Sequence, residues 1–278
     1  MAGPPSWSLM NASSLLTWER TALPEPAIES PPVSESNLRC ENITAQYGPL
    51  IVCRRISITV NPGEIVALIG PNGAGKTSFL HSIGGVINGT GDVYLGPRRL
   101  TGKPAYQRAR IGLATVPDNR GLFPTLTVAE NIRLGARLSP EAQRAAAIEE
   151  ALELFPILRE RWRMAAGSMS GGEQQMLAIA KGLVGRPLAL LLDEPAQGLA
   201  PKVVEALASV LLGLRAGRLP VLLVEQNHTL VEQVADRFVL IVAGQTALEG
   251  GREALRDRER IGKTYLTRSR GPEAPEKE

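Results

Sequence analysis

Residues 70–77, "GPNGAGKT", constrain the fold of this chain more than any other segment. They fit the pattern G-x-x-x-x-G-K-[ST], follow the apolar run "EIVALI" and precede apolar residues at helical spacing. Glycines let consecutive backbone N–H groups curl around phosphate oxygens, and a helix N-terminus adds positive partial charge. This order of strand, loop and helix predicts a phosphate-binding loop and hence nucleotide binding.

The side chains at the end of the loop suit a nucleoside triphosphate. Lys76 is expected to reach the β- and γ-phosphates, and the Thr77 hydroxyl is expected to ligate Mg²⁺. The residues predicted to contact the nucleotide here are Gly70, Pro71, Asn72, Gly73, Ala74, Gly75, Lys76, Thr77 and Ser78.

Two adjacent carboxylates end a second apolar run, "LALLLDEP". Alone, Asp193 and Glu194 would best be interpreted as a helix cap or a salt-bridge pair. Beside a phosphate loop, Asp193 is predicted to hold Mg²⁺, and Glu194 to orient or deprotonate an attacking water. A water-activating residue separates this chain from phosphate-loop kinases, which need none.

The composition sets outer limits on the function. The 278 residues are 44% hydrophobic, which suffices for one large domain or two small ones, and the net charge of +3 is too mild for a dedicated nucleic-acid binder. Cys40 and Cys53 form no CxxC pattern, so no disulfide framework or zinc site is predicted and a reducing, cytosolic setting is favoured. The apolar runs fall short of the roughly 18 residues that a membrane span requires.

The pattern along the chain indicates an α/β fold. Residues 1–36 are rich in Pro and Ser and are expected to be disordered, whereas 251–278 should form a C-terminal helix and a polar tail. Strands are predicted at 37–48, 54–60, 63–70, 188–194 and 220–226. Helices are predicted at 75–86, 126–138 and 139–155.

Two details of these helices are specific enough to check. In the first, Phe79, Leu80, Ile83 and Val86 should form one apolar face. In the third, Ser139 should be the N-cap, with Pro140 at the first helical position.

The stretch "MSGGEQQML", residues 169–177, has a serine and two glycines where a helix should begin. Such a start is either an anion site or an ordinary helix entry. Together with the phosphate loop before it and "LLLDEP" after it, the stretch resembles the signature of the ATP-binding cassette (ABC) family. The resemblance covers about residues 37–250, and "MSGGE" departs from the usual LSGGQ at Met169 and Glu173.

The resemblance implies an α/β cassette with a mostly parallel core sheet, an antiparallel β subdomain and a helical subdomain. A helix-rich insertion begins near residue 102 and runs to about 166, and the helical subdomain extends to about 185. Tyr47 stands where the family places an aromatic ring that stacks on adenine; alone, it would be an ordinary edge-strand tyrosine. The implied activity is ATP hydrolysis with Mg²⁺.

In this family two cassettes pair head to tail, so that the signature of one closes over the γ-phosphate bound by the other. The resemblance therefore implies that four residues contact ATP held by a partner cassette, which is either a second copy or a different chain. They are Ser170, Gly171, Gly172 and Glu173.

Three positions depart from the broad family pattern. Asp118 stands where a Gln is usual, Ala200 replaces an Asp, and Gln226 occupies the place of a His. We count Asp118 and Gln226 among the catalytic candidates with Glu194. His228 lies two residues beyond Gln226 and is expected to point elsewhere.

The particular residues in these motifs resemble those of one subfamily of ABC ATPases. "SGGEQQMLAI", "DEP..GLAP" and "LVEQN" look like an ATPase of branched-chain amino-acid importers, and cassettes of urea and amide importers are similar. The implied partners are a second ATPase subunit, two transmembrane permease subunits and, indirectly, a solute-binding protein, with no nucleic acid. The chain would then sit peripherally on the cytoplasmic face of the cell membrane, with residues 120–126 as candidates for docking the permease. A soluble, non-transport ABC ATPase and a non-hydrolysing regulator are the other classes considered.

Overall fold

The computed structural model describes residues 36–256, whose strands form one sheet of six and one of four. The strands are β1 (Leu38–Tyr47), β2 (Leu50–Val60), β3 (Ile65–Ile69), β4 (Gly89–Leu95), β5 (Arg98–Arg99), β6 (Leu113–Val116), β7 (Ala189–Asp193), β8 (Val221–Val224), β9 (Arg237–Val242) and β10 (Gln245–Gly251).

The larger sheet has the order β10-β9-β3-β8-β7-β6. Its neighbours pair in parallel except for β10, which runs antiparallel to β9. Every residue of β3, β7 and β8 is buried, as expected for strands covered on both faces. The phosphate loop and the Asp193–Glu194 pair therefore emerge from the same end of β3 and β7, two parallel strands that flank β8.

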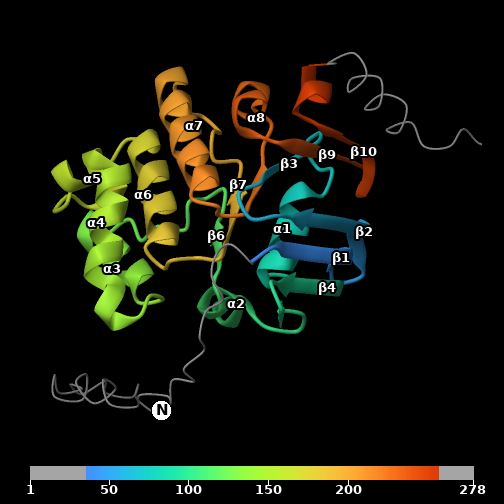
Figure 1. Cartoon of the computed structure of the whole chain (residues 1–278), viewed down its shortest axis with the longest axis horizontal. Helices are drawn as coiled ribbons and strands as arrows, with labels where there is room; N and C mark the ends of the chain where they lie inside the picture. The colour runs from blue at the N-terminus through green and yellow to red at the C-terminus, as the bar shows by residue number, and fades with distance from the viewer. Residues whose placement is uncertain (1–35, 257–278) are drawn as a thin grey trace, which may run out of the picture. The chain divides into compact units, whose positions relative to one another are not determined.

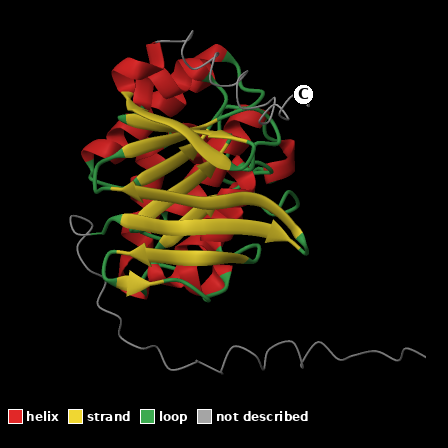
Figure 2. Cartoon of the chain, turned by 90° about the vertical axis from the view of Figure 1, so that its right-hand side faces the viewer, coloured by secondary structure: helices red, strands yellow, loops and turns green. Residues whose placement is uncertain are grey.

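The smaller sheet is antiparallel, with the order β2-β1-β4-β5. Helix α1 packs between the two sheets, because its buried Phe79, Leu80 and Ile83 share one apolar cluster with β1 and β7. Seen from the side of the smaller sheet, the strands lie in front and most helices lie behind them (Figure 2).

The helices are α1 (Lys76–Gly84), α2 (Ala105–Ile111), α3 (Val128–Ala136), α4 (Arg144–Leu154), α5 (Pro156–Glu160), α6 (Gly171–Leu183), α7 (Pro201–Ala216) and α8 (His228–Val234), with 3₁₀ turns η3 (Glu141–Gln143), η4 (Ala166–Ser168) and η5 (Arg252–Arg256). Figure 1 shows α3, α4, α5 and α6 gathered on one side of the molecule, away from β1, β2 and β4. The mostly parallel sheet, the antiparallel sheet and this helical group confirm the predicted fold class.

The prediction for Val86 was wrong. Helix α1 ends at Gly84, and Gly85 takes a left-handed conformation (φ 77°) that closes the helix. Val86 follows this turn and is 58% exposed. Arg108 packs against the turn, because a Cβ on Gly85 would lie 2.8 Å from its Nε atom.

The predicted cap at Ser139 was also wrong. The segment opens with the turn η3, and α4 begins only at Arg144. Ser139 is buried and its hydroxyl donates a hydrogen bond to the carbonyl of Val184, at the end of α6. A tertiary contact thus uses the hydroxyl that a local rule assigns to helix capping.

Residues 1–35 and 257–278 lie outside the described residues. The disordered extension predicted for 1–36 falls there, apart from Ser36. Most of the C-terminal helix and tail predicted for 251–278 falls there too. Cys40 and Cys53 are buried free thiols. Between residues 36 and 256, none of the helices combines the length and the apolar character needed to span a bilayer.

Candidate nucleotide-binding site

The phosphate loop leaves the end of β3 and enters α1, as the motif predicts. Gly70 (φ 154°) and Gly75 (φ 97°) have positive φ, and both lie against backbone. A Cβ on Gly75 would lie 2.6 Å from the carbonyl oxygen of Val52, and one on Gly70 would collide with the carbonyl of Ile241. These contacts leave no room for side chains, so the loop backbone keeps its tight curve.

Lys76 is held inside the loop, with only 4% of its surface exposed. Its ammonium group donates hydrogen bonds to the carbonyls of Gly70 (2.9 Å) and Pro71 (3.0 Å). Burial lowers the pKa of Lys76, and the carboxylates of Glu194 and Asp193 oppose that shift. The charge therefore sits under the loop, placed to meet a phosphate oxygen.

Asp193 ends β7 and is 1% exposed. The Thr77 hydroxyl donates to Asp193 Oδ1 at 3.1 Å, whereas Asp193 Oδ2 is buried without a hydrogen-bond partner in the structure. The pKa of Asp193 is raised to about 6, mainly by burial; the carboxylates of Asp118 and Glu194 add to this shift, and the bond from Thr77 opposes it. An unsatisfied buried carboxylate oxygen is costly unless a cation or donor meets it.

This donor set fits Mg²⁺. The ion prefers oxygen ligands and keeps several waters, so one hydroxyl, one carboxylate and substrate phosphates are enough. Among residues 36–256 no group of three Asp, Glu, His or Cys side chains is placed to hold a metal ion by itself, so phosphate and water would supply the remaining ligands. Asp193 Oδ2 and Thr77 Oγ1 are the atoms that would hold the ion.

Glu194 is half-buried and has a left-handed backbone, with φ 45°. For a residue other than glycine this conformation is strained, and strain of this kind is common at functional sites. The Gln226 side chain donates a hydrogen bond of 2.6 Å to Glu194 Oε1. The structure thus brings together two of the three predicted catalytic residues.

The other positions that depart from the family pattern are Asp118 and Ala200, and of these two only Asp118 has an interaction with the site in the structure. Asp118 is exposed in the loop after β6, near enough to Asp193 to raise its pKa. Ala200 is the exposed N-cap of α7. His228 is the exposed first residue of α8 and is not part of the Glu194–Gln226 contact.

Tyr47 lies at the tip of the β1–β2 hairpin and is 46% exposed. Two further apolar side chains, Leu50 and Ile51, are exposed beside it, opposite Tyr47 and Gln46 in the strand register. The hairpin is held against the phosphate loop through Val52, which contacts Gly75. Sequence reasoning found only Tyr47, although the run "YGPLIV" already carried the signal.

Helix α6 begins with a complete capping box. Ser170 Oγ accepts from the Glu173 backbone N–H (3.3 Å), and the Glu173 carboxylate accepts from the Ser170 N–H (2.9 Å). These bonds hold the pKa of Glu173 below its usual value, the bond from the Ser170 backbone being the main cause. The helix start predicted at "MSGGEQQML" is therefore confirmed.

The two signature glycines contact other parts of the same chain. A Cβ on Gly172 would lie 3.0 Å from Val203 on α7, and one on Gly171 would lie 3.3 Å from the Arg120 guanidinium. Arg120 also donates to Gln174 Oε1 at 2.6 Å. The sequence placed Arg120 in a docking loop, and the structure turns its side chain toward α6.

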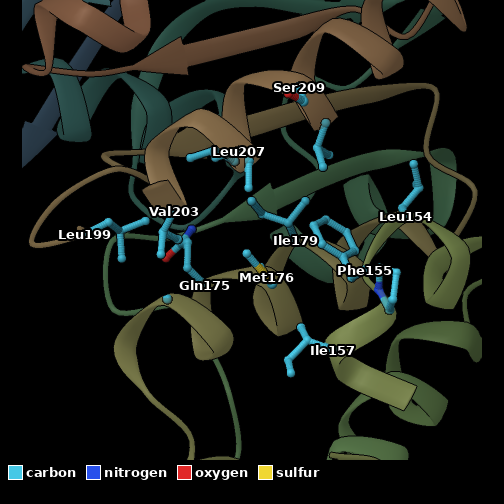
Figure 3. A pocket seen from close by; sticks show the side chains of 14 residues that line it. Leu154, Phe155, Ile157, Gln175, Met176, Ile179, Leu199, Val203, Leu207 and Ser209 are labelled. Carbon is cyan, nitrogen blue, oxygen red and sulfur yellow. The ribbon is translucent and has the colours of Figure 1, made fainter. Parts of the chain in front are cut away.

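An apolar cavity of about 350 Å³ lies between α5, α6 and α7 (Figure 3). Its lining includes Gly172 and Gln175 from α6 and Val203 from α7. The side-chain nitrogen of Gln175 is buried there without a hydrogen-bond partner. The cavity lies apart from the phosphate loop, none of whose residues lines it.

The phosphate loop on β3, the carboxylates after β7 and the capped signature helix define an ATP-binding cassette. Residues 53–197 match the family model described as ABC transporter, and the chain belongs to this family. It is an ATP-binding, ATP-hydrolysing subunit of a transporter.

Curated relatives with transport functions support this assignment. The high-affinity branched-chain amino acid transport ATP-binding protein BraG of Pseudomonas aeruginosa is 36% identical over 82% of this chain and 99% of its own length. The probable branched-chain amino acid transport ATP-binding protein LivF of Archaeoglobus fulgidus is also 36% identical, over 82% and 98%. The lipopolysaccharide export system ATP-binding protein LptB of Haemophilus influenzae is 32% identical, over 83% and 97%.

A solved structure agrees with the fold. The ADP conformation of MJ1267, an ATP-binding cassette of an ABC transporter, superposes with a TM-score of 0.73 at 25% identity, over 83% of this chain and 98% of that one.

Proposed function

We propose that this chain is the ATPase subunit of an importer for branched-chain amino acids. It works on the cytoplasmic face of the cell membrane with a second ATPase subunit, two permease subunits and a solute-binding protein. ATP and Mg²⁺ bind at the phosphate loop of one cassette. The signature of the partner cassette completes the site, and hydrolysis separates the two.

The observation that carries the proposal is the arrangement of five side chains at or after the ends of β3, β7 and β8. Lys76 lies under the phosphate loop, the Thr77–Asp193 pair offers two oxygen ligands, and Glu194 is held by a hydrogen bond from Gln226. This set supplies a phosphate contact, a metal site and a group that accepts a proton from water. Asp118 adds a carboxylate beside the metal site.

The place of the signature supports a paired mechanism. In Figure 1, α6 lies within the helical group, whereas α1 lies beside the antiparallel sheet. Ser170 and its two glycines begin α6, so they belong to a different part of the cassette from Lys76. The N-terminus of α6 offers partial positive charge to an anion that a second cassette brings to it.

The names of two relatives and the residues of the motifs support the proposed cargo. BraG and LivF are both 36% identical to this chain, and both printed names state branched-chain amino acid transport. LptB, named for lipopolysaccharide export, is 32% identical, so the export of a lipid is the alternative that a specific finding favours.

The segment 120–126 supports docking of a membrane partner. Phe123 is 51% exposed, and the Lys181 ammonium lies 4.6 Å from the centre of its ring. Lys181, on α6, also donates to the Gly121 carbonyl at 2.7 Å. Helix α6 therefore holds this loop in place. An exposed aromatic ring on a supported loop is suited to a protein contact.

A mild-detergent pull-down of the tagged chain tests the proposal. Two permease subunits and a solute-binding protein carrying Leu, Ile or Val are expected. Recovery of a lipid exporter would support the alternative function, lipid export. A solute-binding protein carrying urea or an amide would contradict the proposed cargo but not the proposed importer. Recovery with ribosomes or DNA and without membrane subunits would contradict the proposal altogether.

A further inference from the structure

Glu225 is a buried carboxylate beneath the site described above, and the lowering of the Lys76 pKa by burial is opposed in part by its charge. It follows β8 directly and is 2% exposed. Its side chain accepts three backbone N–H groups: Oε1 from Ala196 (2.7 Å), and Oε2 from Gln226 (2.7 Å) and Asn227 (2.8 Å). Its own N–H donates to Leu68 on β3 at 3.3 Å.

These bonds join two loops that are far apart in the sequence. Ala196 lies two residues after Glu194 in the loop that follows β7, whereas Gln226 and Asn227 begin the loop that follows β8. The loops also meet at the surface, where Gln226 donates to Glu194. The buried carboxylate therefore lies below the contact between the half-buried Glu194 and the exposed Gln226.

Resting on the proposed function, we propose that Glu225 is a positioning residue for hydrolysis. It fixes the loop of Glu194 against the loop of Gln226, so that the Gln226–Glu194 hydrogen bond forms at the site of the attacking water. Glu225 itself contacts neither nucleotide nor metal.

A carboxylate suits this task because it accepts hydrogen bonds at both oxygens and donates none. Burial raises the pKa of Glu225, and the three backbone N–H groups oppose that shift by stabilising the charged form. A glutamine of the same shape has one acceptor oxygen, so its –NH₂ group would face either Ala196 or the other two donors. The loops would then lose one of their links while the fold keeps its volume.

The test compares steady-state ATP hydrolysis of the whole chain with Glu225→Gln. A shift of the Glu194 carboxylate by a fraction of an ångström is expected to lower kcat about tenfold or more. The KM for Mg·ATP should change less than about twofold, because Glu225 accepts no hydrogen bond from the phosphate loop and its charge acts on Lys76 less than those of Glu194 and Asp193. An unchanged kcat, or a loss confined to KM, would overturn the proposal.

Glu64→Gln is a matched control. Glu64 precedes β3 at the opposite end of that strand, its side chain is 15% exposed, and it pairs with Arg237 at 2.5 Å. Both kcat and KM should stay within about twofold of the unmodified chain, because this carboxylate bonds to Arg237 and Asn61, far from the site. An equal fall in kcat in both variants would mean that losing any buried carboxylate is enough, which overturns the specific role of Glu225.

A second variant and a second measurement keep the test open if Glu225→Gln fails to fold. Glu225→Asp retains the charge but shortens the reach, so it should lower kcat in the same direction with KM preserved. In the unmodified chain, hydrogen exchange at Ala196, Gln226 and Asn227 should be slowed about a hundredfold relative to an open loop. Exchange at open-loop rates would contradict the geometry on which the proposal depends.

The Glu194→Gln variant distinguishes a failure of the positioning role of Glu225 from a failure of the proposed hydrolytic site. Loss of turnover in Glu194→Gln with normal turnover in Glu225→Gln removes only the positioning role. Normal turnover in Glu194→Gln removes the proposed hydrolytic site, and the role of Glu225 with it.

Discussion

The side-chain amide of Gln226 donates a hydrogen bond of 2.6 Å to the carboxylate of Glu194. The two residues lie 32 positions apart in the sequence and follow neighbouring strands, β7 and β8. Glu194 is also held in a left-handed backbone conformation. The amide of Gln226 is a neutral donor that orients the carboxylate oxygen. Unlike the imidazolium of a histidine, it cannot give up its proton to the carboxylate.

Removing the amide should slow hydrolysis. Gln226→Ala is expected to lower kcat about tenfold, because Glu194 loses the group that orients it. Gln226→His restores a donor and should recover much of that loss. The measurement is steady-state ATPase turnover, with His228→Ala as the control on the exposed first residue of α8. Equal kcat in Gln226→Ala and the unmodified chain would rule out an orienting role.

Removing the charge of Asp193 should stabilise the nucleotide-free protein while abolishing turnover. Its pKa is raised to about 6, above the ordinary value of 3.8, so folding disfavours the charged form. The cost is fully present above pH 6 and disappears as the pH falls toward 4. Asp193→Asn should therefore raise the free energy of unfolding by about 1–2 kcal/mol at pH 7.

Denaturant titrations without Mg²⁺ or nucleotide, at pH 4 and pH 7, check this prediction. Asp92→Asn gives a contrast of opposite sign, because bonds from Arg99 and Thr101 lower the pKa of Asp92. If Asp193→Asn destabilised the chain at pH 7, the buried carboxylate could not be an unsatisfied group awaiting a cation.

The capping box of α6 should appear as a pH-dependent contribution to stability. Glu173→Ala is expected to lower the free energy of unfolding by about 1 kcal/mol at pH 7. Because the folded-state pKa of Glu173 is depressed, the loss is full above pH 4.5 and shrinks as the pH falls through the folded pKa. Glu153→Ala, on the exposed face of α4, should change stability much less. A difference that does not shrink as the pH falls below 4.5 would contradict this account.

Helix α6 approaches α7 closely at Gly172. A methyl group there would lie 3.0 Å from Val203 Cγ1, so Gly172→Ala should cost about 1–3 kcal/mol of stability. Val203→Ala makes room for the methyl group, and the double variant should recover part of the loss. A double-mutant cycle by chemical denaturation measures this coupling. Additive effects of the two substitutions would show that the residues do not meet.

The phosphate loop, the carboxylate pair and the apolar strands could be predicted from the sequence because each depends on a local pattern. Lys76, Thr77 and Asp193 follow from fixed positions at the ends of buried strands, and the structure brings them together. The capped start of α6 was equally local, since Ser170 and Glu173 are three residues apart.

Contacts between distant segments could not be predicted in this way. Arg120 meets Gln174 across 54 positions and Glu225 meets Ala196 across 29, and no local pattern marks either pair. The failure at Ser139 has the same origin, because its hydroxyl bonds to Val184 rather than to its own helix. The hydrogen-bond partner of such a polar side chain depends on which distant segment packs against it. A single sequence does not show that packing.

The most direct test of the whole account is the Glu194→Gln variant, studied with ATP and Mg²⁺ by light scattering and by turnover. The account predicts an ATP-dependent dimer that persists, either with itself or with a second ATPase subunit, and a fall in kcat of about 10²-fold or more. A variant that hydrolyses ATP at the rate of the unmodified chain would contradict the assignment of Glu194, and with it the proposed mechanism.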